Sequence, residues 1–185
     1  MDALKPTTRE RLVEAAFQSF MQSGYDATGL SQILGDAGLS KGAFYHYFSS
    51  KEDIFREVVT AYFLEPLETL DPEMIANRSL KDSRAQLDRF YADLPERVAA
   101  GTGCDMTRYY ALFFESLSRL PEFRAAIQAH YLTLIEALTK RTYEEREVFP
   151  KVAEAHSRHL IASLEGKLFL NAILGDLAPI SSDEG

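Results

Sequence analysis

The sequence is poor in the residues that mark several classes of protein. Its 185 residues include one cysteine and no tryptophan, and only ten glycines and seven prolines. A single cysteine cannot form an intramolecular disulfide framework, and with four histidines it cannot supply the paired thiolates of a structural zinc site. We therefore expect a protein of a reducing compartment that needs no disulfide, metal or other cofactor.

Basic residues are also in the minority. Against 28 Asp and Glu there are 20 Lys and Arg, which gives a formal net charge of -8. This balance excludes a generic polyanion binder with a basic surface throughout, so any nucleic-acid contact has to come from a local face. No stretch approaches the roughly 18 apolar residues that a membrane span needs, and the first residues lack the apolar core of a signal peptide. The expected location is the cytoplasm, with no membrane contact.

The residues that are present predict an all-α fold. With 46% hydrophobic residues the chain can close a core, and the apolar residues recur at helical spacings between sparse glycines and prolines. Capping residues sharpen the expected helix ends: Thr7 and Thr28 start the first two helices, Gly38 ends the second, and Ser49 or Ser50 starts the fourth. The predicted helices cover residues 7–24, 28–37, 40–48, 50–66, 79–100, 105–119, 121–145 and 150–177, with breaks considered at Pro66 and Pro95.

Two of these short helices meet at a turn of three to four residues that contains glycine, which is typical of a helix-turn-helix. Phe44 and Phe48 are spaced four apart and are expected to anchor the third helix in the core. The opposite face of that helix then offers a cation, two small residues and three ring-bearing donors, and a major groove about 12 Å wide admits such a helix. The residues of this face are Lys41, Gly42, Ala43, Tyr45, His46 and Tyr47.

The stretch from Thr8 to Tyr62 closely resembles the amino-terminal domain of the TetR/AcrR family of transcriptional regulators. The resemblance is strongest from Ala37 to Glu52, AGLSKGAFYHYFSSKE, and includes Phe20, Gly24-Tyr25 and Thr28 upstream. It covers roughly the first third of the chain. It implies an all-α homodimer that binds a palindromic DNA operator, with a second domain that binds a small molecule and changes the separation of the two recognition helices.

The resemblance also implies roles for single residues. Lys41, Gly42, Ala43 and Tyr45 fall where the family reads base edges, and His46, Tyr47 and Lys51 fall where it grips phosphates. Thr28 and Ser31 belong to the supporting helix and are expected to contact the DNA backbone. Leu34 departs from the pattern, because many members have alanine there. By the same resemblance, residues 1–50 form the DNA-binding domain, residues 51–70 link it, and residues 51–185 bind the effector and form the dimer.

An aromatic set in the second domain is expected to line an effector cavity; for any single member core packing is the more common role, and it is the set together that favours a cavity. Its members are Phe90, Tyr91, Tyr109, Tyr110, Phe113, Phe114 and Tyr131. The helix that carries residues 109–114 is apolar nearly all round, so other helices are expected to surround it. The last two helices are expected to form the dimer interface, with packing inside one subunit as the alternative.

These observations favour a homodimeric repressor that releases its operator when a small apolar or aromatic compound binds. Two alternatives stay open. A small helical enzyme would use Glu115, His130 or the His156/His159 pair, but no catalytic group can be assembled from them and we expect none. A helical dimer that binds a protein partner would keep the helix-turn-helix as scaffold. The His156/His159 spacing suits a metal, yet a surface role is favoured, and Glu115 is expected to pair with Arg119.

Overall fold

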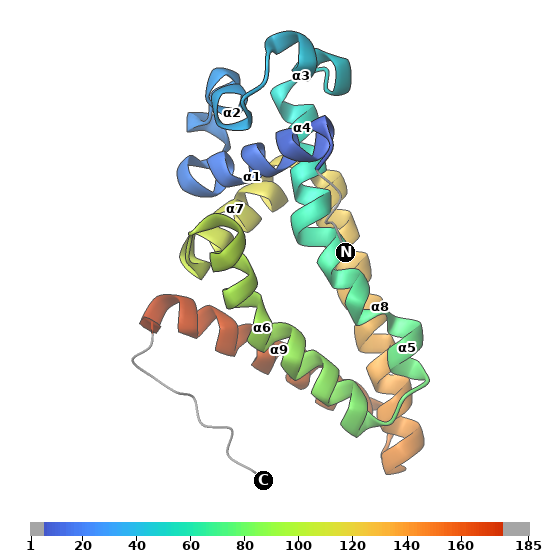
Figure 1. The fold of residues 1–185 in the computed structure, drawn as a ribbon. Coiled ribbons are helices and arrows are strands. Elements are labelled where there is room, and N and C mark those ends of the chain that lie inside the picture. Colours follow the sequence, from blue (N-terminus) through green and yellow to red (C-terminus); the bar gives the residue numbers. More distant parts are fainter. Residues whose placement is uncertain (1–5, 176–185) are drawn as a thin grey trace, which may run out of the picture.

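The computed structural model describes residues 6–175, all of whose regular elements are helices (Figure 1). The all-α prediction is confirmed. The order is α1 Thr8–Ala27, α2 Leu30–Ala37, α3 Lys41–Tyr47, α4 Lys51–Val59, η1 Thr60–Leu64, η2 Glu65–Leu70, α5 Pro72–Ala76, α6 Leu80–Thr102, α7 Met106–Arg119, α8 Pro121–Arg146 and α9 Pro150–Leu174. The predicted end of the last helix and the tail lie outside the described residues.

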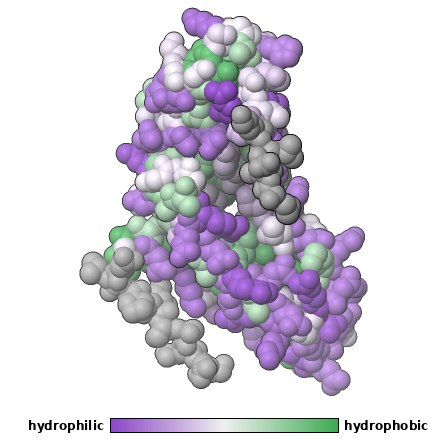
Figure 2. All heavy atoms as spheres, in the orientation of Figure 1, coloured by the Kyte–Doolittle hydropathy of each residue, from purple (hydrophilic) through white to green (hydrophobic). Residues whose placement is uncertain are grey.

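The helices form two tiers. Figure 1 shows α1, α2 and α3 at one end of the molecule, with α4 running from them alongside α8 towards the other end. There α5 lies against α8, and α6 crosses α9. The surface in Figure 2 is mostly hydrophilic over the lower tier and is hollowed near the middle, where apolar residues show. Among residues 6–175, no helix is long and apolar enough to cross a membrane.

Most of the predicted helix ends are confirmed. Thr7 caps α1 through its side chain, which accepts from the Glu10 amide, and the Glu10 carboxylate accepts in return from the Thr7 amide at 2.7 Å. Gly38 ends α2 with a φ of +63°, a left-handed angle that glycine adopts without steric cost. Of the two candidate serines, Ser50 caps α4, and its hydroxyl oxygen lies 3.0 Å from the Asp53 amide.

The prediction that Thr28 caps α2 is wrong. The chain turns sharply at Gly24, where φ is +77°, and α1 then continues to Ala27, so that Thr28 sits at the end of α1. Its side chain points inward, and its hydroxyl contacts the carbonyl oxygens of Gly24 at 2.7 Å and Ser19 at 3.1 Å. Gly29 takes the N-cap position of α2 and offers no side-chain bond. Thr28 was expected to cap the start of α2, but its hydroxyl stabilises the end of α1 instead.

Of the two prolines considered as breaks, Pro95 leaves its helix continuous, whereas the α-helix expected to run to Pro66 already ends at Val59. After α4 the chain widens to the π-turn η1 and tightens to the 3-10 segment η2, which contains Pro66 and ends at Leu70. Pro95 lies inside the continuous helix α6. The short helix α5 was not predicted, because it is one turn long; its signals are the capping Asp71, which accepts from the Glu73 amide, and Pro72 at its first position.

One buried cluster runs from α1 to α9 and joins the two tiers. Its amino-terminal part centres on the fully buried rings of Phe20, Phe44 and Phe55. Phe44 is 0% exposed and Phe48 is 5% exposed, so the predicted inward face of α3 is confirmed. The ring of Phe17 stacks on that of Tyr62, with centroids 3.7 Å apart, and so connects α1 to the helical segment after α4.

The expectation that other helices surround α7 is wrong for one of its faces. Leu112 and Ser116 are buried, but Ala111 is exposed and Phe114 is 54% exposed. The buried side of α7 packs against α1, α6, α8 and α9. In the described part of a single chain, no element covers the opposite side, so its apolar residues remain open to solvent.

Helix α7 is tied to the last turn of α1. A carboxylate oxygen of Glu115 accepts a hydrogen bond from the Tyr25 amide at 3.0 Å, and its other oxygen lies 3.6 Å from Arg119, the pair expected from the sequence. The Arg119 guanidinium lies 4.1 Å from the centre of the Tyr25 ring and donates to Asp26 at 2.8 Å. These contacts hold the end of α1 against α7.

We expect Glu115→Ala to lower the free energy of unfolding by about 1–3 kcal/mol, because it leaves the Tyr25 amide without its charged acceptor. Urea denaturation followed by circular dichroism measures this change. Glu154→Ala is the control, since Glu154 pairs with Arg158 on an exposed helix face and such pairs contribute less than about 1 kcal/mol. Equal stability of the two variants would contradict the role given to Glu115.

His130 on α8 predicts a pH dependence of stability. Burial lowers the pKa of His130 below its ordinary value of 6.5, and Nε2 is buried with no hydrogen-bond partner among the described residues. The unfolded chain then binds a proton more readily than the folded protein. The contribution of the neutral His130 to the free energy of unfolding is therefore complete above pH 6.5. It is lost as the pH falls through the lowered pKa of His130 in the folded protein.

Thermal unfolding at a series of pH values between about 7 and 5 measures this loss. His130→Gln should flatten the decline, because the amide does not titrate. His156→Gln, which removes an exposed histidine of α9, should leave the decline as it is. A decline that persists unchanged in His130→Gln would refute the assignment.

Candidate DNA-binding surface and effector cavity

Helix α3 presents the predicted DNA-reading residues at one end of the molecule (Figure 1). The Ser40 side chain caps it by accepting from the Ala43 amide at 3.2 Å, and Phe44 and Phe48 fix it to the core. The residues on the other face are therefore held outward by packing. Lys41, Gly42, Tyr45, His46 and Tyr47 are exposed, Ala43 is half-buried, and Ser31 on α2 is exposed. Their contact with DNA stays a prediction.

Thr28 differs from the other predicted DNA-contacting residues. Its side chain is 1% exposed, and its hydroxyl is taken up by the carbonyl oxygens of Ser19 and Gly24. In this conformation it cannot reach a phosphate, because the polar atom faces the interior. We therefore correct the expectation for Thr28 and assign it to the support of the loop before α2.

Lys51, predicted to grip a phosphate, is largely engaged within the protein. Its Nζ atom donates to the carbonyl oxygens of Tyr25 at 2.8 Å and Thr28 at 2.9 Å, and it lies 4.1 Å from the centre of the Tyr25 ring. An ammonium has three N–H donors, so one is left for another acceptor. The phosphate contact of Lys51 stays a prediction that rests on this one donor.

Other cations near α3 are also engaged. Arg9 pairs with Glu57 at 2.7 Å, Arg11 donates to the Ala37 carbonyl at 2.7 Å, and Arg56 pairs with Glu52 and Glu122. Lys41 forms no ion pair within residues 6–175. Few phosphates can therefore be neutralised by one chain, and the affinity of one chain for arbitrary DNA should be low.

The predicted aromatic residues of the second domain surround a cavity of about 280 Å³. All seven lie on its wall, contributed by α6, α7 and α8. Its other lining residues are Phe63, Pro66, Leu67, Leu94, Ile127, Glu165 and Leu168. The structure thus brings the sequence-predicted set together around one space, while its binding of an effector stays a prediction.

Glu165, which was not among the residues predicted from the sequence, is the polar centre of this cavity. Its Oε1 atom accepts hydrogen bonds from the hydroxyls of Tyr91, at 2.6 Å, and Tyr131. Burial, and after it the negative charge of Glu165, raise the pKa of Tyr91, Tyr109, Tyr110 and Tyr131 above the ordinary value for tyrosine. All four hydroxyls are therefore uncharged at neutral pH. A carboxylate between small and apolar residues of α9 was the signal that could have pointed to the site.

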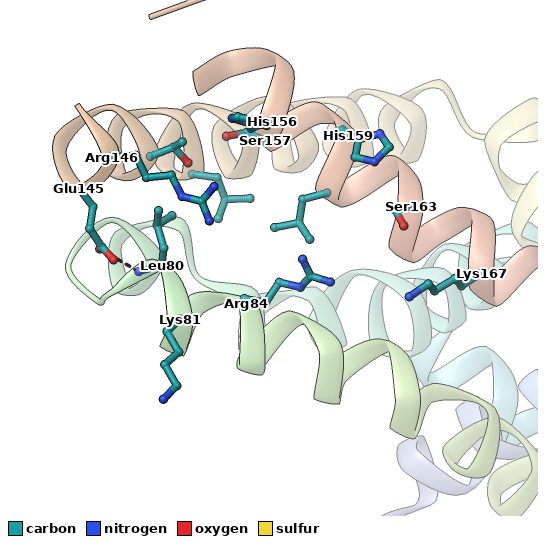
Figure 3. A pocket seen from close by; sticks show the side chains of 13 residues that line it. Leu80, Lys81, Arg84, Glu145, Arg146, His156, Ser157, His159, Ser163 and Lys167 are labelled. Atoms are coloured by element: carbon teal, nitrogen blue, oxygen red, sulfur yellow. Dashed lines mark hydrogen bonds between the residues drawn. The ribbon is translucent and has the colours of Figure 1, made fainter. Parts of the chain in front are cut away.

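A second, more polar groove lies between α6, α8 and α9. Figure 3 shows Arg84 and Arg146 reaching into it from α6 and α8, and the Glu145 carboxylate bonded to the Leu80 amide. His156 and His159, weighed above as metal ligands, line this groove. Among residues 6–175, no three His, Cys, Asp or Glu side chains come together in a way that could hold a metal ion.

Comparison with known proteins agrees with this geometry. The sequence model described as "Bacterial regulatory proteins, tetR family" matches residues 12–58, which span α1 to α4. The HTH-type transcriptional regulator YxaF of Bacillus subtilis is 43% identical over 54 residues, which cover 29% of this chain and 28% of that protein. The biofilm operon negative transcriptional regulator IcaR of Staphylococcus aureus is 24% identical over 168 residues, covering 89% of this chain and 83% of IcaR.

The likeness of fold extends beyond the matched segment. The crystal structure of a transcriptional regulator from Aquifex aeolicus superposes with a TM-score of 0.64 at 23% identity, covering 93% of this chain and 90% of that one. At this identity the superposition speaks for the fold alone, and the amino-terminal match speaks for the helix-turn-helix. Together they show that the chain belongs to the TetR/AcrR family of helix-turn-helix transcriptional regulators.

Proposed function

We propose that the protein is a homodimeric cytoplasmic repressor that binds a palindromic operator and releases it when a small apolar or aromatic effector enters the 280 Å³ cavity. As a family member it is a DNA-binding transcriptional regulator and not an enzyme. That the protein represses transcription is proposed beyond this, and the negative regulator IcaR among its relatives supports repression. We place the DNA-binding domain in residues 1–50, with α4 and the segment to residue 70 linking it to the effector and dimerisation domain.

The outward face of α3 is the single observation that carries DNA binding. Tyr45 is 58% exposed and Tyr47 is 40% exposed, so both rings lie open on the face of α3 opposite the buried Phe44 and Phe48. Gly42 has no side chain to hold the helix away from a groove, and an added Cβ would lie 3.8 Å from Ser40 Oγ, an ordinary contact. The folded chain alone therefore gives no steric reason for glycine at this position.

We expect Gly42→Ala to separate stability from DNA binding. Alanine in a helix should raise the free energy of unfolding by up to about 1 kcal/mol, while its methyl group obstructs approach to the groove. Tyr45→Ala should weaken operator binding by about 1–3 kcal/mol for each half-site through the loss of base-edge contacts. Fluorescence anisotropy with a duplex from the upstream intergenic region, over a salt series, measures operator binding by both variants, and urea denaturation measures the stability of Gly42→Ala.

Gly101→Ala is the matched control, because Gly101 is an exposed helical glycine on α6 with no atom near its added Cβ. It should leave operator affinity unchanged. Saturable binding that depends on the palindrome and is weakened in the two α3 variants supports the regulator. Binding that ignores both sequence and substitution would instead favour the alternative in which the helix-turn-helix is scaffold for a protein partner.

An exposed stripe on α9 supports the homodimer. Its residues alternate in spacings of three and four, and those in the middle are small, which lets another helix approach closely. Val152, Phe169 and Ile173 are 42%, 44% and 62% exposed in the single chain. The full stripe is Val152, Ala155, His159, Ala162, Gly166, Phe169 and Ile173. Apart from His159 this face is apolar, and an exposed apolar face of this length is typical of a subunit interface.

We expect Ala162→Glu to convert the dimer to a folded monomer, because the carboxylate would be buried without a partner between two copies of α9. Sedimentation equilibrium measures the molecular mass, and operator affinity should fall in parallel since one half-site is lost per particle. Ala92→Glu, on an exposed face of α6, is the control and should remain dimeric. A dimeric Ala162→Glu protein would place the interface elsewhere.

Helix α7 supports a route from the cavity to the DNA-binding domain. One end of α7 lines the cavity with Tyr109, Tyr110 and Phe113. Further along α7, Glu115 and Arg119 hold Tyr25 in the last turn of α1. A ligand that prefers a displaced α7 would shift the population of the whole protein towards the arrangement that binds DNA poorly. A ligand with equal affinity for both arrangements would change nothing.

A further inference from the structure

The effector cavity has a charge asymmetry that narrows the class of its ligand. Among the described residues that line it, Glu165 alone carries a formal charge, and the others are aromatic, aliphatic or uncharged tyrosine. The inference below rests on the proposed function in taking this cavity as the effector site. Beyond the proposed function, the residues of the wall determine which ligand charge the cavity stabilises.

The hydrogen bonds of Glu165 leave one of its oxygens available. Both tyrosine hydroxyls, from Tyr91 on α6 and Tyr131 on α8, donate to Oε1. They fix the carboxylate from two sides, so that α9 is joined to α6 and α8 at this point. Within residues 6–175 no donor is directed at Oε2. Glu165 is half-buried and Oε2 is not among the buried unpaired atoms, so this oxygen is open to the cavity and can accept from a ligand.

A second polar atom in the wall also lacks a partner. The hydroxyl of Tyr110 is inaccessible to water and makes no hydrogen bond among the described residues. Its ring meets those of Phe114, at 6.0 Å between centroids, and Phe169, at 5.5 Å. The wall of the cavity therefore holds two oxygens without a partner, the open Oε2 of Glu165 and the covered oxygen of Tyr110, next to several aromatic faces.

No basic side chain competes for this carboxylate inside the cavity. Arg97 is near enough to lower the pKa of Tyr109 slightly against the larger effects of burial and Glu165, but it does not line the cavity. It is exposed, donates to the Phe90 carbonyl at 3.2 Å, and lies 5.0 Å from the Phe90 ring centre. A ligand cation would meet one carboxylate and aromatic faces, both of which stabilise positive charge, whereas a ligand anion would be repelled.

We propose that the cavity binds a small lipophilic amine in its protonated form. The ammonium group donates to Oε2 of Glu165 and to the hydroxyl oxygen of Tyr110, and the apolar part of the ligand lies against Phe113 and Phe114. A protonated amine fits better than a quaternary ammonium, because it supplies the N–H donors that both acceptors lack. Glu165 thereby sets the specificity of the cavity for charge, and the aromatic wall sets its preference for apolar groups.

A set of probes that differ only in charge tests this proposal. Isothermal titration calorimetry of the full-length protein compares 4-phenylbutylamine, 4-phenylbutanol and 4-phenylbutyrate, which share one phenylalkyl chain. Tyrosine emission gives a second readout, because the chain has no tryptophan and four of its nine tyrosines line the cavity. The amine should bind at least about tenfold more tightly than the alcohol, and the carboxylate should bind more weakly than either.

Glu165→Gln is the decisive variant, since glutamine keeps an oxygen that accepts from Tyr91 and Tyr131 but carries no charge. The ratio of amine to alcohol affinity should fall by about tenfold or more in this variant. Tyr110→Phe should reduce amine affinity by a smaller factor, because it removes one neutral acceptor and keeps the ring. Glu154→Gln, on an exposed turn of the same helix, is the control and should keep the ratio of the natural protein. Circular dichroism verifies that each variant is folded.

The outcomes separate this proposal from the proposed function. Equal affinity for amine and alcohol, tighter binding of the carboxylate, no saturable amine binding, or an unchanged ratio in Glu165→Gln would each overturn the cation site. Operator binding is measured in the same samples. If the amine binds through Glu165 but leaves the operator occupied, the cation site stands and effector-controlled release fails. If the operator is bound specifically while the amine fails to bind, the regulator stands and the cation site fails.

Discussion

The structure depends above all on the packing around Tyr25, where three helices are joined through one side chain. The Tyr25 ring is 9% exposed and has the Lys51 ammonium and the Arg119 guanidinium each 4.1 Å from its centre. Its amide donates to Glu115 and its carbonyl accepts from Lys51. Because Lys51 starts α4 and Arg119 ends α7, the end of α1 cannot move without disturbing both helices. The position of the helix-turn-helix relative to the cavity is therefore set at this residue.

Gly24 makes this arrangement possible. Its φ of +77° turns the chain back so that the Tyr25 amide faces α7, and a Cβ there would lie 3.4 Å from the Glu115 carboxylate. A residue with a side chain would be strained by the angle alone. The contacts are polar and lie near the surface of the protein, whereas the core beneath them is apolar.

How much could be predicted from the sequence depended on whether a feature was local. The capping box at Thr7, the left-handed Gly38 and the inward Phe44 and Phe48 each follow from a few neighbouring residues, and each is confirmed. Thr28 also carries a capping signal, but the chain reverses at Gly24 and the hydroxyl finds carbonyl groups of α1 instead. Tertiary contacts outweighed local preference at that position, and the same holds for the open face of α7.

The sequence by itself determined the class of the fold, the helix-turn-helix and the outward face of α3, because helical period and turn chemistry act over a few residues. It also identified the aromatic residues that surround the cavity, though not that they share one space. Only the tertiary structure showed that Glu165 joins Tyr91 and Tyr131, which are 74 and 34 positions away in the sequence. Only the tertiary structure showed, too, that Lys51 faces inward and donates to the Tyr25 carbonyl. Hydrogen bonds between distant helices have no sequence period, so their partners are decided only when the helices pack.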